Sequence, residues 1–452
     1  MKMKTLGLLP VAMSSLAIAM TATYAHAGDG VAELLLKKGV ISAAEYKQLK
    51  KESDSAAAKK AAAPATPNVS FSKGFVISSD DGDSSVQIGT LMQLDAAGYN
   101  DSGSIDNAAG TEMRRGRLNL RGKFMKDWQY KFELEMFGSS GAQVTDTYVR
   151  YNGFKPFEST KPLALTVGHF KIPFSLEQQM SISTVSLMEH SLPNAMLNSR
   201  APGVMLSTSG SHWSAAAMGY GEQLYSNTSS PKQDEGGGVS TRITWAPLLD
   251  KNSALHLGFS AQYNKPTQSD GGATIAFSSR PESHMTSTKL ISTGTISGDV
   301  SGTKLFGAEL AGSYGPLTLQ SEYIRTEVAR DTGADPTFAG WYVQGAWMLT
   351  GEHRGYNTAS GIFKGIHPAH PVSVNGDSGT GAWELTARYS TLDLNDAGIT
   401  GGRERDTTLG IGWYANNYVR ICGEWVHVYA IDGGTYDGDS LNTLQMRFQL
   451  AY

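Results

Sequence analysis

The stretch Leu444-Gln-Met-Arg-Phe-Gln-Leu-Ala-Tyr452 decides the fold, because its residues alternate with a period of two. Every second residue from Leu444 to Tyr452 is apolar or aromatic, and polar residues fill the positions between them up to Gln449. Successive side chains of a strand point to opposite faces, so one face of this strand is apolar and the other is polar. Such a strand is typical of a transmembrane β-barrel, whose outer face meets lipid and whose inner face meets water.

The same alternation recurs from Phe71 onward, between loops rich in Gly, Asn, Asp and Ser. Clear examples are the segments 117–121, 131–136 and 383–390. Their polar faces carry too many charges for the core of a soluble sandwich. The length of the region, divided by a typical strand plus loop, gives about 16 strands, with 18 as the alternative. We therefore predict an all-β fold, a closed antiparallel transmembrane barrel over residues 68–452.

The N-terminus has the pattern of an export signal. Lys2 and Lys4 form a basic start, residues 6–20 are mainly apolar, and Ala25-His-Ala27 offers a small-x-small cleavage site. We expect residues 1–27 to be a signal peptide, because the apolar run is too short to cross a bilayer of about 30 Å. No later segment reaches about 18 consecutive apolar residues, which excludes a helical membrane protein.

Residues 28–67 differ from the rest of the chain and predict a short helical segment in the periplasm. Ser42-Ala-Ala-Glu45 has the pattern of a capping box, which opens a helix. The Ala/Lys/Pro-rich residues 56–67 then predict a linker. The segment is interpreted as a trimerisation element, as a cell-wall contact, or as a marginal helical tail with no specific role.

Composition and motifs exclude several classes of function. The chain has 38 Lys and Arg against 42 Asp and Glu, a net charge of -4, which is too acidic for a nucleic-acid binder. The single Cys422 cannot form an internal disulfide. There is no HExxH, P-loop or GxSxG motif, and His367 and His370 beside Pro368 are typical of an ordinary loop. We therefore expect no enzyme activity, no metal and no cofactor.

Period-two placement predicts which charged side chains face the lumen. Arginine keeps its charge and can bind phosphate or carboxylate oxygens bidentately, and rings of such residues set anion selectivity in pores. The alternative is that these arginines pair with lumen carboxylates and only brace the wall. The basic residues placed in the lumen are Arg115, Arg117, Arg121, Lys131, Arg150, Arg242, Arg388, Arg420 and Arg447, and the acidic ones are Glu133, Glu135, Asp146, Glu309, Glu384 and Glu424.

The segment 172–199 is unlike the strands around it. It contains Pro173 and Pro193, lacks clean alternation, and is more apolar than exposed loops usually are. It contains no Lys or Arg, and its titratable residues are Glu177, Glu189 and His190. We expect this loop to fold into the barrel and narrow it, with an ordinary extracellular loop as the alternative.

Several blocks carry a resemblance to a known family. Arg114-Arg-Gly-Arg-Leu118, Asp146-Thr-Tyr-Val-Arg-Tyr151 and Val167-Gly-His-Phe-Lys-Ile-Pro-Phe-Ser-Leu-Glu177 resemble the phosphate-selective porin O/P family, and further blocks at 349–356, 381–390 and 409–414 follow in order. The resemblance spans roughly residues 70–452. It implies a 16-stranded trimeric barrel with an inward-folded third loop, which passes phosphate and related anions by passive diffusion. It also makes Lys171 and Arg200 candidates for the constriction.

These observations together predict a passive, water-filled channel in the outer membrane of a Gram-negative bacterium. Its expected partners are outer-membrane lipid, two further copies in a homotrimer, and small anionic solutes, with no nucleic acid. One alternative is a general porin with no phosphate preference, because the loop 172–199 supplies no cation. An outer-membrane barrel enzyme or adhesin is disfavoured, because no catalytic motif and no long extracellular insertion is present.

Overall fold

The computed structural model describes residues 36–39, 42–48, 50–51, 67–71, 74–138, 141–156, 161–222, 235–268, 272–373 and 379–452. The chain divides into two units, Met1–Thr66 and Pro67–Tyr452. In the first unit, residues 43–48 are helical. The Ser42 hydroxyl accepts from the backbone N–H of Glu45, and the Glu45 carboxylate accepts from the backbone N–H of Ser42. The predicted capping box is therefore confirmed, whereas the expected signal peptide and most of the linker lie outside the described residues.

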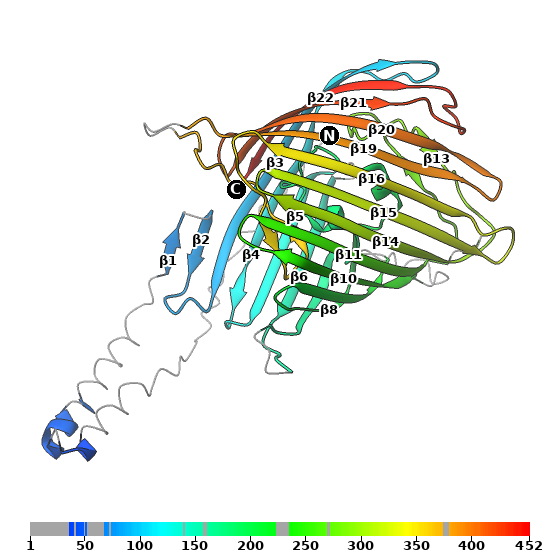
Figure 1. Cartoon of the computed structure of the whole chain (residues 1–452). Coiled ribbons are helices and arrows are strands. Elements are labelled where there is room, and N and C mark those ends of the chain that lie inside the picture. Colours follow the sequence, from blue (N-terminus) through cyan, green and yellow to red (C-terminus); the bar gives the residue numbers. More distant parts are fainter. Residues whose placement is uncertain are drawn as a thin grey trace, which may run out of the picture. The chain divides into compact units, whose positions relative to one another are not determined.

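The second unit is a closed barrel of antiparallel strands (Figure 1). Its sheet has 18 strands, of which 16 form the ring, because β1 (Asn68–Ser70) and β2 (Phe75–Ser78) only extend the edge of β3. The ring consists of β3 (Ser85–Asp101), β4 (Gly110–Phe124), β5 (Trp128–Gly138), β6 (Gly141–Tyr151), β7 (Ala164–Lys171), β8 (Arg200–Ser209), β9 (Trp213–Gly221), β10 (Gly237–Leu249), β11 (Ser253–Lys265), β14 (Val300–Tyr314), β15 (Leu317–Arg330), β16 (Thr337–Met348), β19 (Ala382–Asp396), β20 (Ile399–Tyr414), β21 (Val419–Val428) and β22 (Leu441–Ala451).

The ring closes where the last strand pairs with the first. β22 runs antiparallel to β3, from Leu441 opposite Asp101 to Ala451 opposite Leu91. Closure matters because a strand edge in lipid would leave backbone N–H and C=O groups without partners. The predicted closed antiparallel barrel is confirmed, with 16 strands and not 18 in the ring.

The alternation in the sequence becomes an outer and an inner face of this wall. In β22 the side chains of Leu444 and Met446 are 69% and 55% exposed, whereas Gln445 and Arg447 are each 2% exposed. The apolar residues therefore lie on the outside, as a lipid-facing wall requires. No helix among the described residues is long and apolar enough to cross a membrane.

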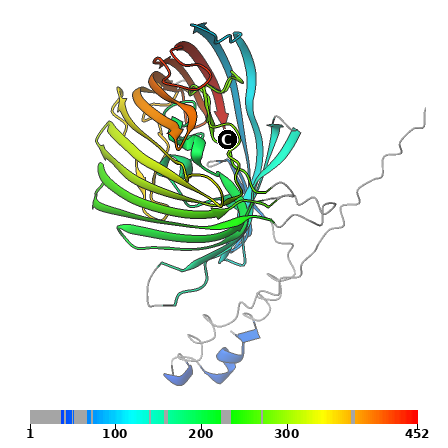
Figure 2. The same cartoon turned by 90° about the vertical axis from the view of Figure 1, so that its right-hand side faces the viewer.

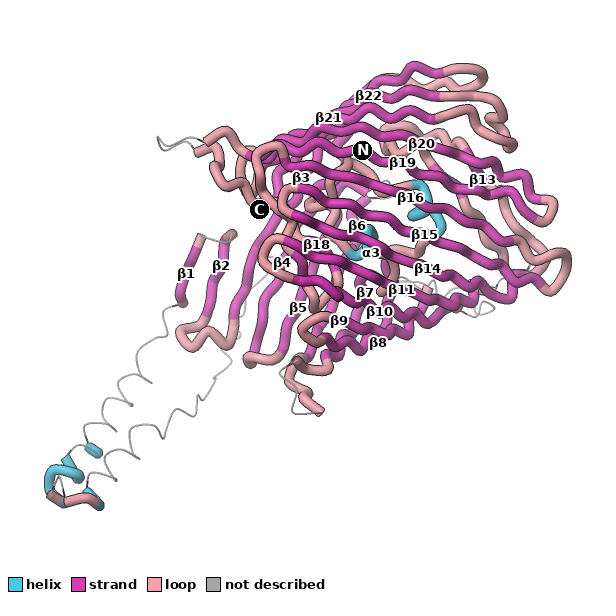
Figure 3. The backbone as a smooth tube through the Cα atoms, viewed as in Figure 1, coloured by secondary structure: helices cyan, strands magenta, loops and turns pink. Residues whose placement is uncertain are grey.

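Three segments fold inside the barrel and fill much of it (Figure 2). They are the loop 172–199, the β11–β14 connection, described over 266–268 and 272–299, and the β16–β19 connection, described over 349–373 and 379–381. Because the strands alternate in direction, the first two enter from one end and the third enters from the other. Their short elements are α3 (Leu176–Gln179), labelled in Figure 3, η1 (Leu192–Met196), and the pairs β12 (Ser278–Ser279) with β13 (Ile291–Ser292) and β17 (Tyr356–Asn357) with β18 (Ile362–Phe363).

Apolar contacts hold these segments to each other and to the inner face of the wall. One cluster joins Phe174 and Leu192 of the loop 172–199 to Leu290 of the β11–β14 connection and to wall residues such as Leu392. A second cluster brings Leu176 against Phe363, so the segments from opposite ends meet inside the barrel. The predicted inward folding of the loop 172–199 is therefore confirmed.

Candidate functional site: a charged cavity inside the barrel

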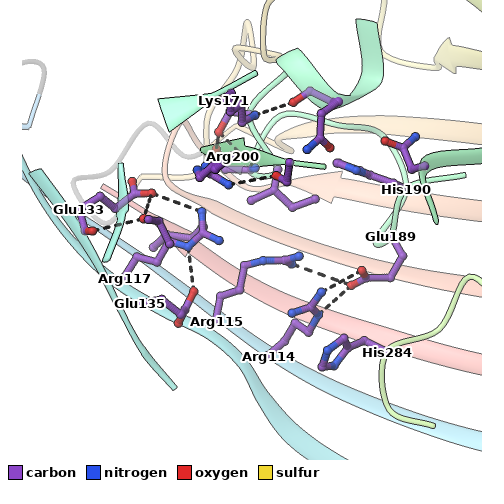
Figure 4. A pocket seen from close by; sticks show the side chains of 18 of the residues that line it. Arg114, Arg115, Arg117, Glu133, Glu135, Lys171, Glu189, His190, Arg200 and His284 are labelled. Carbon is purple, nitrogen blue, oxygen red and sulfur yellow. Dashed lines mark hydrogen bonds and ion pairs between the residues drawn. The ribbon is translucent and has the colours of Figure 1, made fainter. Parts of the chain in front are cut away.

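A cavity of about 1030 Å³ remains beside the inward segments. Its lining comes from β4, β5 and β6, from the loop 172–199, and from the residues that follow β12 (Figure 4). The lining is strongly charged. Among the described residues, its basic side chains are Arg114, Arg115, Arg117, Arg121, Lys131, Lys171, Arg200, Arg280 and Lys289, and its acidic side chains are Glu112, Glu133, Glu135, Asp146, Glu189 and Glu282.

A β-bulge in β4 gives the cavity two adjacent arginines. Gln93 of β3 pairs with Arg115, but the next residue, Leu94, pairs with Met113, so Arg114 is the extra residue of the bulge. A bulge redirects side chains that strict alternation would place on opposite faces. Arg114 and Arg115 therefore both reach the cavity, whereas period-two placement predicted only Arg115 for the lumen. The Gly116 that follows this pair is the one local signal of an irregular strand.

Glu189 of the loop 172–199 lies at the centre of an arginine cluster (Figure 4). Its carboxylate accepts two hydrogen bonds from Arg114, each 3.0 Å long, and one of 2.7 Å from Nη2 of Arg447. Nη1 of Arg115 is 3.9 Å from the same carboxylate. Burial opposes ionisation of Glu189, but the three arginines outweigh it and hold the pKa of this carboxyl well below its usual range.

The cations farther along the wall are paired with carboxylates of neighbouring strands. Nε of Arg117 is 2.8 Å from Glu135 and its Nη1 is 3.4 Å from Glu133. Asp146 accepts from both Lys131, at 2.5 Å, and Arg200, at 2.6 Å. These pairs bring together five of the predicted lumen residues and the constriction candidate Arg200 in one ladder across β4, β5, β6 and β8.

Four lining cations make no ion pair with a carboxylate among the described residues: Arg121, Lys171, Arg280 and Lys289. Nζ of Lys171 instead donates to the backbone carbonyls of Gln178 and Met180, both at 2.7 Å, at the end of α3. Lysine at this position suits the negative end of the helical turn and leaves its charge without an acidic partner. Nε of Arg121 donates to the amide oxygen of Gln87 at 3.1 Å.

The remaining predicted residues, apart from Arg150, face inward but lie under the inward segments. Arg242 is paired with Glu309 at 2.7 Å, Arg388 with Glu177 at 3.2 Å, and Arg447 with Asp95 at 2.6 Å. Arg420 donates to the backbone carbonyls of Val185 and Ser186. Glu384 accepts from Arg354 at 2.8 Å, Glu424 accepts from the backbone N–H of Met188 at 2.6 Å, and Arg150 donates to Asn152 at 3.0 Å.

These buried contacts match the alternative given for the lumen arginines, in which they pair with carboxylates and brace the wall. They hold the loop 172–199 and the β16–β19 connection against the wall, so they position the surface of the cavity without forming it. Sequence reasoning missed Arg354, Glu282 and Arg114, because each acquires its place only through a connection or a bulge that folds inward.

Two histidines line the cavity, His190 and His284. Burial, and after it the charge of the nearby Lys171, lower the pKa of His190 to about 3. The pKa of His284 is also lowered, first by burial and then by Arg114, while Nδ1 of His284 lies 2.9 Å from Glu112. Both side chains are therefore neutral near pH 7 and add nothing to the charge of the lining.

A closed 16-stranded antiparallel barrel with an apolar outer face and an inward loop that narrows a charged lumen is the architecture of an outer-membrane porin. The chain belongs to the family described as phosphate-selective porin O and P, whose model matches residues 86–452. Its place is therefore the outer membrane of a Gram-negative bacterium.

Relatives and solved structures agree with this assignment. Porin O of Pseudomonas aeruginosa is 26% identical over 82% of this chain and 90% of its own length. An uncharacterised protein of Caulobacter vibrioides is 29% identical over 75% of this chain and 68% of its own. The fold is similar to an anion-selective porin from Comamonas acidovorans (TM-score 0.51, 14% identity, 82% of this chain and all of that one). It is also similar to a loop-deletion mutant of OmpT from Vibrio cholerae (TM-score 0.50, 11% identity, 81% and 99%).

Proposed function

We propose that this porin is a passive, water-filled channel that favours small anions. The observation that carries the proposal is the charge of the cavity lining, in which nine Lys and Arg side chains face six Asp and Glu among the described residues. A positive lining with low-dielectric walls raises the local concentration of anions and lowers that of cations. The family assignment, with its fold, points to a channel and not to an enzyme.

The sign of the reversal potential tests this proposal. Purified protein is inserted into a planar bilayer that separates two KCl solutions of different concentration, and the zero-current voltage is measured. Net positive fixed charge in the lumen predicts the sign that corresponds to chloride permeating faster than potassium. The opposite sign, or a voltage of zero, contradicts an anion channel and leaves the porin fold intact.

We further propose that phosphate is a permitted solute but not a strongly bound one. Five of the lining cations are already close to carboxylates, namely Arg114, Arg115, Arg117, Lys131 and Arg200. The loop 172–199 adds no cation of its own. Phosphate added at low concentration should therefore reduce chloride current only weakly. Strong block at micromolar phosphate contradicts this statement and supports a dedicated phosphate site.

We propose that the protein acts as a homotrimer and that residues 1–27 are removed on export, with residues 28–67 in the periplasm. An apolar outer wall, on which Leu444, Phe259 and Trp245 are more than half exposed, supports association with lipid and with further copies. Cross-linking in native membranes tests the trimer, and a cross-linked product that stays monomeric refutes it. The mass of the mature N-terminus tests cleavage after Ala27.

A further inference from the structure

Glu189 combines two properties that no other acidic residue of the loop 172–199 has. Its side chain is 15% exposed and lines the cavity, and it also contacts Arg114 and Arg447 directly. Glu177, the other carboxylate of this loop, is 3% exposed and accepts hydrogen bonds from Ser191 and Asn194. A solute in the cavity can therefore reach Glu189, whereas Glu177 makes hydrogen bonds within the loop.

The carboxylate of Glu189 is surrounded by arginine donors. Nε and Nη2 of Arg114 each lie 3.0 Å from one of its two oxygens, which is the bidentate geometry that guanidinium groups form with carboxylate or phosphate. Arg447 adds a third hydrogen bond to Oε1 and is itself held by Asp95 at 2.6 Å. The guanidinium groups of Arg114 and Arg447 are thus already bound to an anion, which is the carboxylate of Glu189.

The backbone around Glu189 is anchored without its carboxylate. The N–H of Met188 donates to Glu424 at 2.6 Å, and the carbonyl of Met188 accepts from Arg447. Arg420 donates to the carbonyls of Val185 and Ser186. Removing only the charge of Glu189 leaves these contacts in place, so the loop should keep its position in a variant that lacks this charge.

We propose that Glu189 is a built-in counter-anion that competes with permeating anions for Arg114 and Arg115 and so sets the weak affinity of the channel for oxyanions. The inference rests on the proposed anion function and deepens it, because it names the residue that limits affinity. A permeating phosphate or organic carboxylate must share or displace this carboxylate before it reaches the two arginines. The channel then exchanges anions quickly instead of retaining them.

The test is the substitution Glu189→Gln in the full-length protein, with inorganic phosphate as the probe of chloride current in planar bilayers. The amide keeps the shape of the side chain and removes one negative charge a few ångströms from the arginines. At the effective dielectric of a wet cavity, this should lower the half-blocking phosphate concentration by roughly tenfold. Glu327→Gln is the control, because it neutralises a carboxylate that is 38% exposed and does not line the cavity, and it should leave the half-blocking concentration unchanged.

A second variant separates charge competition from a change in loop position. In the double variant Arg114→Gln/Glu189→Gln, the gain in phosphate block should be lost, because the freed donor is absent. Single-channel conductance is recorded for every variant. An unchanged half-blocking concentration in Glu189→Gln overturns the proposal, and so does a larger conductance without tighter block, which assigns Glu189 a purely steric role. The reversal potential of the unmodified protein tests the anion function separately, so the two failures are distinguishable.

Discussion

Replacing Arg242 by Gln should destabilise the barrel strongly, because this side chain connects the wall to the segment that enters from the other end. Nε and Nη2 of Arg242 donate to the two oxygens of Glu309 at 2.8 and 2.7 Å. Nη1 and Nη2 also donate to the backbone carbonyls of Ser360 and Gly361, both at 2.9 Å. The side chains of Arg242 and Glu309 are 5% and 0% exposed, so water screens neither of them.

The expected cost follows from the groups that Arg242→Gln leaves behind. Glu309 would keep its contacts with His256, at 2.9 Å, and Ser260, at 3.3 Å. It would lose the guanidinium group that donates to both of its oxygens. The backbone carbonyls of Ser360 and Gly361, the second of them buried, would lose their donors at the same time. Removing one partner of a buried, hydrogen-bonded ion pair costs about 3–5 kcal/mol of unfolding free energy. We expect a value of this size for Arg242→Gln.

The assay is urea unfolding of the detergent-solubilised barrel, followed by the shift between the folded and unfolded bands in an unheated gel. Arg121→Gln is the matched control, because Arg121 also faces the lumen but is exposed and, among the described residues, donates only to Gln87, so its loss should cost less than about 0.5 kcal/mol. If both substitutions shift the midpoint equally, Arg242 does not hold the β16–β19 connection to the wall.

Two further predictions concern the outer face and the effect of pH. Leu444→Arg places a charge on the lipid face of β22 and should destabilise the barrel by up to about 2–4 kcal/mol, measured in the same urea titration; an unchanged midpoint would contradict lipid exposure at this position. Burial and the nearby Lys171 lower the pKa of His190 to about 3, so this side chain stays neutral as pH falls from 7.5 to 5.5. His190→Gln should therefore leave the pH dependence of the reversal potential unchanged over this interval, and a variant that abolishes a rise in anion preference centred on the ordinary histidine pKa would show that His190 does titrate.

The barrel was predictable because each strand repeats the same physical requirement. One face meets lipid and the other meets water, so the alternation seen in 444–452 recurs around the ring. The strand count was harder, because β1 and β2 satisfy the same pattern without belonging to the ring. Lengths of strands and loops alone cannot separate a short flanking hairpin from a wall strand.

The site was only partly predictable. Arg115, Arg117 and Lys131 reach the cavity as period-two placement predicts, but the bulge that turns Arg114 inward depends on the pairing with β3. Arg388 and Arg420 face inward, yet connections from distant parts of the sequence cover them. Which inward charge stays accessible is decided by these long-range contacts, and alternation along one strand carries no information about them.

The most direct test of the central claim neutralises the lining cations that have no acidic partner and measures the reversal potential across a KCl gradient. This variant should lose the anion preference of the unmodified channel, while a control with exposed charges removed outside the cavity, Arg403→Gln/Arg405→Gln, should keep it. A neutralised variant that retains the full anion preference would contradict the claim that the charge of the cavity lining selects the solute. The substitutions are Arg121→Gln, Lys171→Gln, Arg280→Gln and Lys289→Gln, combined in one chain.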